Sequence, residues 1–267
     1  MTRTVLRFVS LLAASSVVCL PSVAQSVGTE AEPHYLNACT PVDTTTAVSD
    51  WVRQSPLYGK TMVIVGDSYV RNHRGRIEDT WHWRVAQKYH MSYYNYGRNG
   101  NCVAFDRKNW GISMLHRFSE MKKDADYVVI VAGHNDASLI AAAEDVDTAT
   151  WNPDRKKAYS DSMLQLFEEN VTAFVDSLIA RYPSARICWF TPWNVPRPGF
   201  REMHSVLTRV LESRAIPYFD AAHRSGIYVW DPAFRRRYFQ GPNDTAHLNP
   251  RGHQLFQNKA ESFLLSL

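Results

Sequence analysis

The stretch Met62-Val63-Ile64-Val65-Gly66-Asp67-Ser68 decides how this chain is expected to fold. Its first four residues are apolar without alternation, a pattern typical of a strand buried on both faces of a parallel sheet. The three residues that follow are small or polar and predict a tight turn at the carboxyl end of that strand. Ligands bind at this edge in open α/β sheets, so the turn also marks a candidate site.

Similar strands recur further along the chain. Unbroken apolar runs at residues 127–131 and 187–190 predict two more strands that are buried on both faces. Residues 91–96 and 218–219 are weaker strand candidates because they mix polar and aromatic side chains.

Helical patterns lie between these strands. Residues 163–178 place apolar side chains at spacings of three and four, which predicts a helix with one buried face. Asn249 suits the N-cap of a last helix, and Pro250 suits its first position. The alternation of strands and helices indicates an α/β domain with a central parallel sheet.

The first 24 residues are predicted to be a signal peptide. Arg3 and Arg7 give a positive start, residues 8–20 are largely apolar, and small residues lead to a cleavage site after Ala24. The apolar run is shorter than the roughly 20 residues that a membrane span needs. We therefore expect a secreted or periplasmic protein without stable insertion in the membrane.

The remaining chain divides into two predicted parts. Residues 25–58 carry no strong periodicity and are expected to form an extended leader, whereas residues 59–267 form the folded domain. The formal net charge is only +4, and the one short basic run is Arg235-Arg236-Arg237. No nucleic-acid partner is expected from so mild a charge.

The cysteines leave their pairing open. Cys188 lies in an apolar run and is predicted to be a buried thiol, whereas Cys39 and Cys102 could form a disulfide in an oxidising compartment. Cys19 would be the processing site of a lipid-anchored protein, an alternative that the bulky Val18 before it disfavours.

Polar residues gather in four short blocks where such a sheet would bind a ligand. Residues 66–68, 97–100 and 133–136 follow predicted strands, and residues 244–247 precede the last helix. Acyl transfer to a serine needs a base, a group that orients the base, and donors for the oxyanion. Ser68 is the candidate nucleophile, although a serine here could also do no more than cap a helix.

The fourth block supplies a candidate base. A separation of three residues can bring the Asp244 carboxylate to the imidazole of His247, which leaves Nε2 free to take a proton. The competing interpretation is a capping aspartate beside a surface histidine. His253 is a second histidine nearby, but it falls inside the predicted last helix.

The oxyanion donors are expected to be the backbone amides of Ser68 and Gly100 and the side-chain amide of Asn135. A glycine at position 100 suits a backbone that approaches the substrate closely. An ordinary turn would also explain it, as it would explain Gly97.

Taken together, the four blocks resemble those of the SGNH hydrolase superfamily, the GDSL-like esterases and lipases, over roughly residues 59–267. The resemblance implies a flavodoxin-like three-layer α/β/α sandwich and ester hydrolysis through an acyl-serine intermediate, without a cofactor or metal. It assigns Ser68, Asp244 and His247 to the catalytic triad, and Gly100 and Asn135 to the oxyanion hole. The match around Gly100 is the loosest of the four.

Arginines and tryptophans near the blocks favour a polar substrate. We expect Arg71, Arg98 and Trp193 to bind it, and further candidates are Arg74, Trp81, Trp83, Arg197 and Trp230. Planar donors and aromatic faces suit a carbohydrate, so a short acyl group, acetyl, on a saccharide is the preferred substrate. The apolar residues 139–143 leave a lipolytic esterase or lysophospholipase as an alternative.

Other function classes fit less well. An α/β-hydrolase needs a G-x-S-x-G elbow, which the chain lacks. A metal-dependent phosphatase could use residues 133–136, yet no H-E-x-x-H pattern accompanies them. A non-catalytic sugar-binding relative would not need every triad position filled. A sugar O-acyltransferase would use the same triad and stays open.

Overall fold

The central sheet of the computed structural model has six strands in the order β1-β3-β2-β4-β5-β6. The model describes residues 38–40, 43, 45, 47–141 and 160–267, so the predicted signal peptide lies outside the described residues. The strands are β1 (Ala38–Thr40), β2 (Thr61–Gly66), β3 (Ser92–Gly97), β4 (Tyr127–Val131), β5 (Arg186–Phe190) and β6 (Tyr218–Phe219).

Strands β2 to β6 are parallel, and β1 pairs antiparallel with the outer edge of β3. Counted along the chain, the five parallel strands follow the order 2-1-3-4-5, which is the flavodoxin-like, doubly wound arrangement. The predicted fold class is therefore confirmed. The edge strand β1 comes from the segment expected to be a leader, residues 25–58.

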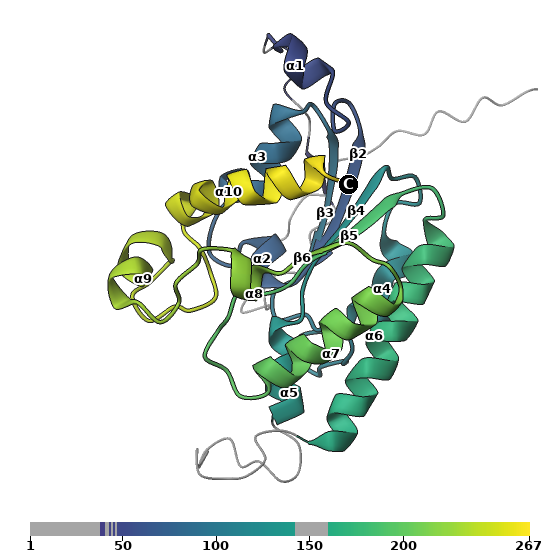
Figure 1. Ribbon diagram of the computed structural model, residues 1–267, viewed down its shortest axis with the longest axis vertical. Helices are drawn as coiled ribbons and strands as arrows, with labels where there is room; N and C mark the ends of the chain where they lie inside the picture. Colours follow the sequence, from purple (N-terminus) through teal and green to yellow (C-terminus); the bar gives the residue numbers. More distant parts are fainter. Residues whose placement is uncertain (1–37, 41–42, 44, 46, 142–159) are drawn as a thin grey trace, which may run out of the picture. The chain divides into compact units, whose positions relative to one another are not determined.

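Helices pack on both faces of the sheet (Figure 1). One group contains α3 (Trp81–Lys88) and α10 (Pro250–Leu265), which contact each other. The other group contains α4 (Met114–Arg117), α5 (His134–Ala141), α6 (Asp161–Arg181) and α7 (Phe200–Ser213). The other α-helices of the described chain are short: α1 (Asp50–Arg53), α2 (Ser68–Arg71), α8 (Ala221–Arg224) and α9 (Pro232–Tyr238). Two 3₁₀ helices, η1 (Ile77–Asp79) and η2 (Phe118–Glu120), add one turn each.

Strand β5 shows why the apolar runs are unbroken. Trp189 packs edge-on against Phe174 of α6, whereas its neighbour Phe190 packs against Trp81 of α3 and Phe256 of α10. Successive side chains of a strand point to opposite faces, so each face needs its own apolar residues once helices cover both.

The last helix begins at its predicted cap, and the long helix α6 buries its predicted face. Asn249 accepts a hydrogen bond from the Gly252 backbone amide at 3.0 Å, and Pro250 takes the first position of α10. In α6, the predicted apolar stripe is buried from Phe167 to Leu178. Within the described residues, no helix is both long and apolar enough to cross a membrane.

Two cysteines are free and buried. Burial raises the pKa of the Cys102 thiol and that of the Cys188 thiol. Cys188 is thus the buried thiol that its apolar run predicted. Cys102 is a free thiol and not half of the disulfide that the sequence allowed, and the side chain of Cys39 lies outside the described part of the chain.

Candidate active site

A cleft of about 940 Å³ opens at the carboxyl ends of β2, β3 and β4. The chain leaves β2 and β4 for helices on opposite faces of the sheet, and in doubly wound folds this switch point is where ligands bind. The cleft is lined by one residue or more from each of the four predicted blocks: Ser68, Gly100, Asn135, Asp244 and His247.

A chain of hydrogen bonds joins three of these side chains. The Ser68 hydroxyl lies 2.9 Å from Nε2 of His247, and Nδ1 of the same ring lies 2.9 Å from Oδ2 of Asp244. The other oxygen of Asp244 accepts from the backbone amides of Ala246 at 2.8 Å and His247 at 2.9 Å. Hydrogen bonds therefore hold both oxygens of the carboxylate, and one of these bonds joins it to the imidazole ring.

This arrangement keeps the carboxyl group of Asp244 ionised. Burial alone would raise its pKa, but the hydrogen bonds and electrostatic attraction from His247, together with the hydrogen bond from the Ala246 amide, outweigh burial and lower the pKa to about 2. A carboxylate at Nδ1 holds the ring in the tautomer whose Nε2 can accept a proton from Ser68.

The alternative histidine lies elsewhere. His253 is buried in α10, and its Nε2 lies 3.3 Å from the side-chain oxygen of Asn72. Burial lowers the pKa of His253 to about 3, so the ring is neutral at ordinary pH. His247, and not His253, is the histidine that reaches Ser68.

Local structure holds Ser68 at the floor of the cleft. It is the first residue of α2, and the preceding Asp67 caps that helix by accepting from the Tyr69 amide at 2.8 Å. A Cβ atom on Gly66 would lie 2.4 Å from the Val131 backbone oxygen, so only glycine allows β2 to turn so close to β4.

The other two expected oxyanion donors, Gly100 and Asn135, also border the cleft. Gly100 has a φ of +69°, and a Cβ atom there would lie 2.2 Å from the ring of Trp110. Asn135 lies in the first turn of α5 and donates one N–H of its amide to the backbone oxygen of Asn101 at 3.1 Å. A side-chain amide carries two N–H groups, so a second one remains for a ligand.

Buried polar groups fix the loop that carries Gly100. The Asp136 carboxyl accepts from the backbone amides of Val103 and Ala104, both at 2.9 Å, and thereby joins α5 to this loop. The side-chain oxygen of Asn101 accepts from Arg117 at 2.7 Å. Because these bonds tie α5 and the loop together, Asn135 and Gly100 keep a fixed relation to each other.

Three residues expected to bind substrate do not line the cleft: Arg71, Arg98 and Trp193. Trp193 is buried and stacks on Tyr69 of α2 with 4.3 Å between ring centroids, so it packs against the helix that carries Ser68 and does not enter the cleft. Arg98 forms an ion pair with Glu120 at 3.7 Å. Of the wider set, Arg74 and Arg197 line the cleft, whereas Trp81 is core and Trp230 is exposed.

Other cleft residues had no signal in the sequence. Arg107 and Trp110 come from the loop after β3, which has no periodicity, and His73 follows α2. The His73 ring stacks on that of His247, with 4.5 Å between their centroids. An aromatic contact between residues so distant in sequence can be seen only once the chain is folded.

A buried serine that is hydrogen-bonded to a half-buried histidine and aspartate, on a doubly wound sheet, defines the chain as a carboxylic ester hydrolase of the SGNH type. The model of the GDSL-like Lipase/Acylhydrolase family matches residues 64–255, and the chain belongs to this family. The match contains both Ser68 and His247. No curated protein sequence shows a significant match to the chain.

Solved structures share this fold at low sequence identity. A protein from Lactobacillus plantarum is 17% identical with a TM-score of 0.61, over 78% of this chain and 97% of that one. An acetyl xylan esterase from Butyrivibrio proteoclasticus is 12% identical with a TM-score of 0.53, over 79% and 64%. A family two carbohydrate esterase from Clostridium thermocellum is 13% identical with a TM-score of 0.53, over 78% and 64%.

Proposed function

We propose that this protein hydrolyses a short acyl ester, an acetyl ester, on a saccharide through an acyl-serine intermediate. The observation that carries the proposal is the unbroken hydrogen-bonded chain from Asp244 through His247 to Ser68 at the floor of an open cleft. A serine hydroxyl alone is a poor nucleophile, and it becomes effective when an oriented imidazole removes its proton.

In the first half-reaction, Nε2 of His247 takes the Ser68 proton as Oγ bonds to the carbonyl carbon of the ester. The carbonyl π electrons move to its oxygen, and the resulting oxyanion accepts from the Ser68 and Gly100 backbone amides and from Asn135. Collapse of this intermediate breaks the bond to the sugar oxygen, which leaves with the proton from His247.

In the second half-reaction, water takes the place of the sugar. His247 removes a proton from the water as its oxygen attacks the acyl-serine, and the same donors hold the second oxyanion. As this intermediate collapses, the bond between Ser68 Oγ and the acyl carbon breaks, and His247 returns its proton to Oγ. The products are a carboxylic acid and the free enzyme.

The lining of the cleft supports a polar substrate. Arg107 and Arg197 offer planar donors, and Trp110 offers an aromatic face, which is the combination that binds sugar hydroxyls and rings. Arg197 is already oriented, because its guanidinium donates to the His134 backbone oxygen at 3.2 Å and to Ser138 at 2.9 Å. Two proteins that share the fold bear the names acetyl xylan esterase and carbohydrate esterase.

The segment that suggested a lipolytic enzyme does not favour one. Of the apolar residues 139–143, the first three belong to α5, where Ile140 and Ala141 are buried against the domain. The side chains of Ile140 and Ala141 pack inside the domain, so they do not offer an apolar surface to an alkyl chain. The remaining two residues, 142 and 143, lie outside the described residues.

We also propose that the protein acts outside the cytoplasm, secreted or in a periplasm. The support is the sequence of residues 1–24, with its basic start, apolar run and small-residue cleavage pattern after Ala24. Amino-terminal sequencing of the mature protein from its native host tests this, with Gln25 expected as the first residue.

Labelling with a fluorophosphonate probe tests the nucleophile. We expect one modified residue, Ser68, and loss of labelling in Ser68→Ala. Ser138→Ala is the matched control because it removes another serine hydroxyl from the same cleft, and labelling should persist. A probe attached to any other residue would refute the assignment.

Acetate release from a panel of acetylated glycans then tests the substrate. Wild-type enzyme should release acetate from them, and Ser68→Ala should lower the rate by several orders of magnitude, as loss of a triad member does. A clear preference for long-chain acyl esters would overturn the carbohydrate proposal and leave the acyl-serine mechanism intact.

A further inference from the structure

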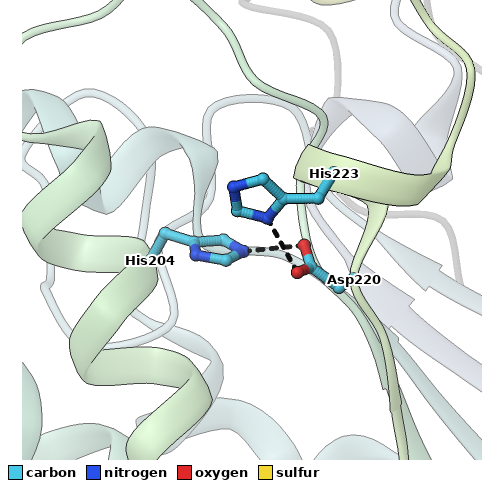
Figure 2. Close-up of side chains that lie close together, drawn as sticks. All are labelled: His204, Asp220 and His223. Atoms are coloured by element: carbon cyan, nitrogen blue, oxygen red, sulfur yellow. Dashed lines mark hydrogen bonds and ion pairs between the residues drawn. The ribbon is translucent and has the colours of Figure 1, made fainter.

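Two histidines and an aspartate lie close together (Figure 2). His204 lies on α7, Asp220 directly follows β6, and His223 lies on α8. None of the three lines the catalytic cleft. The cluster therefore joins two elements of the fold, α7 and the segment β6–α8, that the ester hydrolysis does not use.

The carboxylate of Asp220 lies between the two rings. Its Oδ1 is 3.1 Å from Nε2 of His204, and its Oδ2 is 2.8 Å from Nδ1 of His223. The three ligand atoms all lie within 4.8 Å of one another. Both rings thus present a nitrogen toward one point beside the carboxylate.

The cluster has a rigid side and an open side. The side chain of His204 is 11% exposed, and its ring stacks on Phe200 with 6.0 Å between centroids. The backbone amide of Ala221, next to Asp220, donates to Thr191 at 2.9 Å and fixes the start of α8. By contrast, the His223 side chain is 68% exposed and can adjust its position.

This set of donors matches the ligands of a borderline transition-metal ion. Two imidazoles and one carboxylate are the protein ligands of many zinc sites, with an additional position left for water. Zinc bonds of about 2.0–2.1 Å place tetrahedral ligand atoms roughly 3.4 Å apart. The two contacts with the carboxylate, 3.1 Å from His204 to Oδ1 and 2.8 Å from His223 to Oδ2, are already this short but involve different oxygens. A small rotation of the carboxylate and of the exposed His223 is therefore needed to place one oxygen and both nitrogens around an ion.

We propose that His204, Asp220 and His223 bind a divalent transition-metal ion, with Zn²⁺ as the probe. The ion replaces the two hydrogen bonds to Asp220, and the proton of each neutral imidazole moves to the other ring nitrogen. Water on the exposed side completes the coordination. The ion joins α7 to α8 and acts on the stability of the fold, because it does not reach the nucleophile.

Isothermal titration calorimetry of the full chain without a polyhistidine tag tests the site with Zn²⁺ alone. We expect one site in the wild type, and His223→Gln should weaken it at least about 100-fold, since even loss of a group behind a metal ligand costs 10–100-fold. His116→Gln is the matched control, because His116 is also exposed and lies 2.8 Å from an aspartate, Asp106. Its affinity for Zn²⁺ should equal that of the wild type.

A thermal melt gives a second measurement that does not depend on esterase activity. Saturating Zn²⁺ should raise the Tm of the wild type, and the same addition should leave the Tm of Asp220→Asn unchanged, because a ligand stabilises only a fold that binds it. Absence of zinc binding, or zinc binding that survives His223→Gln, would overturn the proposal. Survival would point to the triad histidine as the ligand, and zinc would then inhibit hydrolysis.

Discussion

Replacement of Asp244 by asparagine separates the orienting role of this residue from its place in the fold. In the wild type, one carboxylate oxygen accepts two backbone N–H groups and the other accepts from Nδ1 of His247. Asp244→Asn keeps the size of the side chain but turns one acceptor into an NH₂ donor. The variant must therefore give up either the imidazole contact or the backbone contacts.

Each choice has a cost that the structure defines. If the amide oxygen keeps the backbone bonds, the NH₂ group faces Nδ1 and forces the proton onto Nε2, the wrong tautomer, which lowers kcat about 10⁴-fold. If the amide flips, the backbone N–H groups of Ala246 and His247 lose their hydrogen-bond acceptor. This conformation is then less stable by about 1–3 kcal/mol for each N–H group, or about 2–6 kcal/mol together. Even the smallest of these penalties, about 2 kcal/mol, corresponds to about a 30-fold loss of rate. The expected loss of activity therefore lies between about 30-fold and about 10⁴-fold.

Hydrolysis of a small activated acetate ester measures this loss as kcat/KM, and the Tm of the variant checks that it folds. Asp220→Asn is the matched control, since Asp220 also pairs with a histidine three residues later at 2.8 Å. The control should hydrolyse the ester at the wild-type rate. If Asp244→Asn stays within about tenfold of the wild type, or about 1.4 kcal/mol, the orienting role is wrong.

Two further predictions concern buried polar groups near the site. Asn135→Ala should lower kcat by about 10²–10³-fold, the usual effect of losing an oxyanion donor. Asn170→Ala is its control, because it also removes an amide that donates to the loop carrying Gly100, at 2.9 Å, and it should leave kcat unchanged. Equal losses in the two variants would mean that Asn135 only supports the loop. Burial raises the pKa of Asp67 from 3.8 to about 7, so the folded state holds this proton more tightly and wild-type stability should fall as pH rises from about 4 to 7. In Asp67→Asn, the free energy of unfolding should fall by up to about 4 kcal/mol less over this pH range than in the wild type. Denaturant unfolding at pH 4 and pH 8 measures the difference. A substitution that changes the free energy of unfolding equally at both pH values would contradict the prediction.

Local patterns were enough to predict the framework. The unbroken apolar runs at residues 62–65, 127–131 and 187–190 became β2, β4 and β5, because a strand covered by helices on both faces has no polar positions. Asn249 and Pro250 began α10 as expected, because capping depends only on neighbouring residues.

One part of the candidate site is local in sequence, and the other depends on the fold. The pair Asp244 and His247 is local, since three residues of a turn bring the carboxylate to Nδ1. The bond from His247 to Ser68 joins residues 179 positions apart, and it exists because the strand order brings β2 and the loop before α10 to one edge of the sheet.

What the sequence determined by itself is the set of buried strands, the capped helices and the polar blocks that end the strands. What only the tertiary structure decided is which side chains share a space. Trp193 turned inward onto Tyr69, whereas Arg107 and Trp110 entered the cleft from a loop without periodicity. His204 likewise met Asp220 and His223 through the packing of α7. Sequence patterns constrain residues a few positions apart, but contacts across the fold depend on how the strands are ordered and how the loops between them pack.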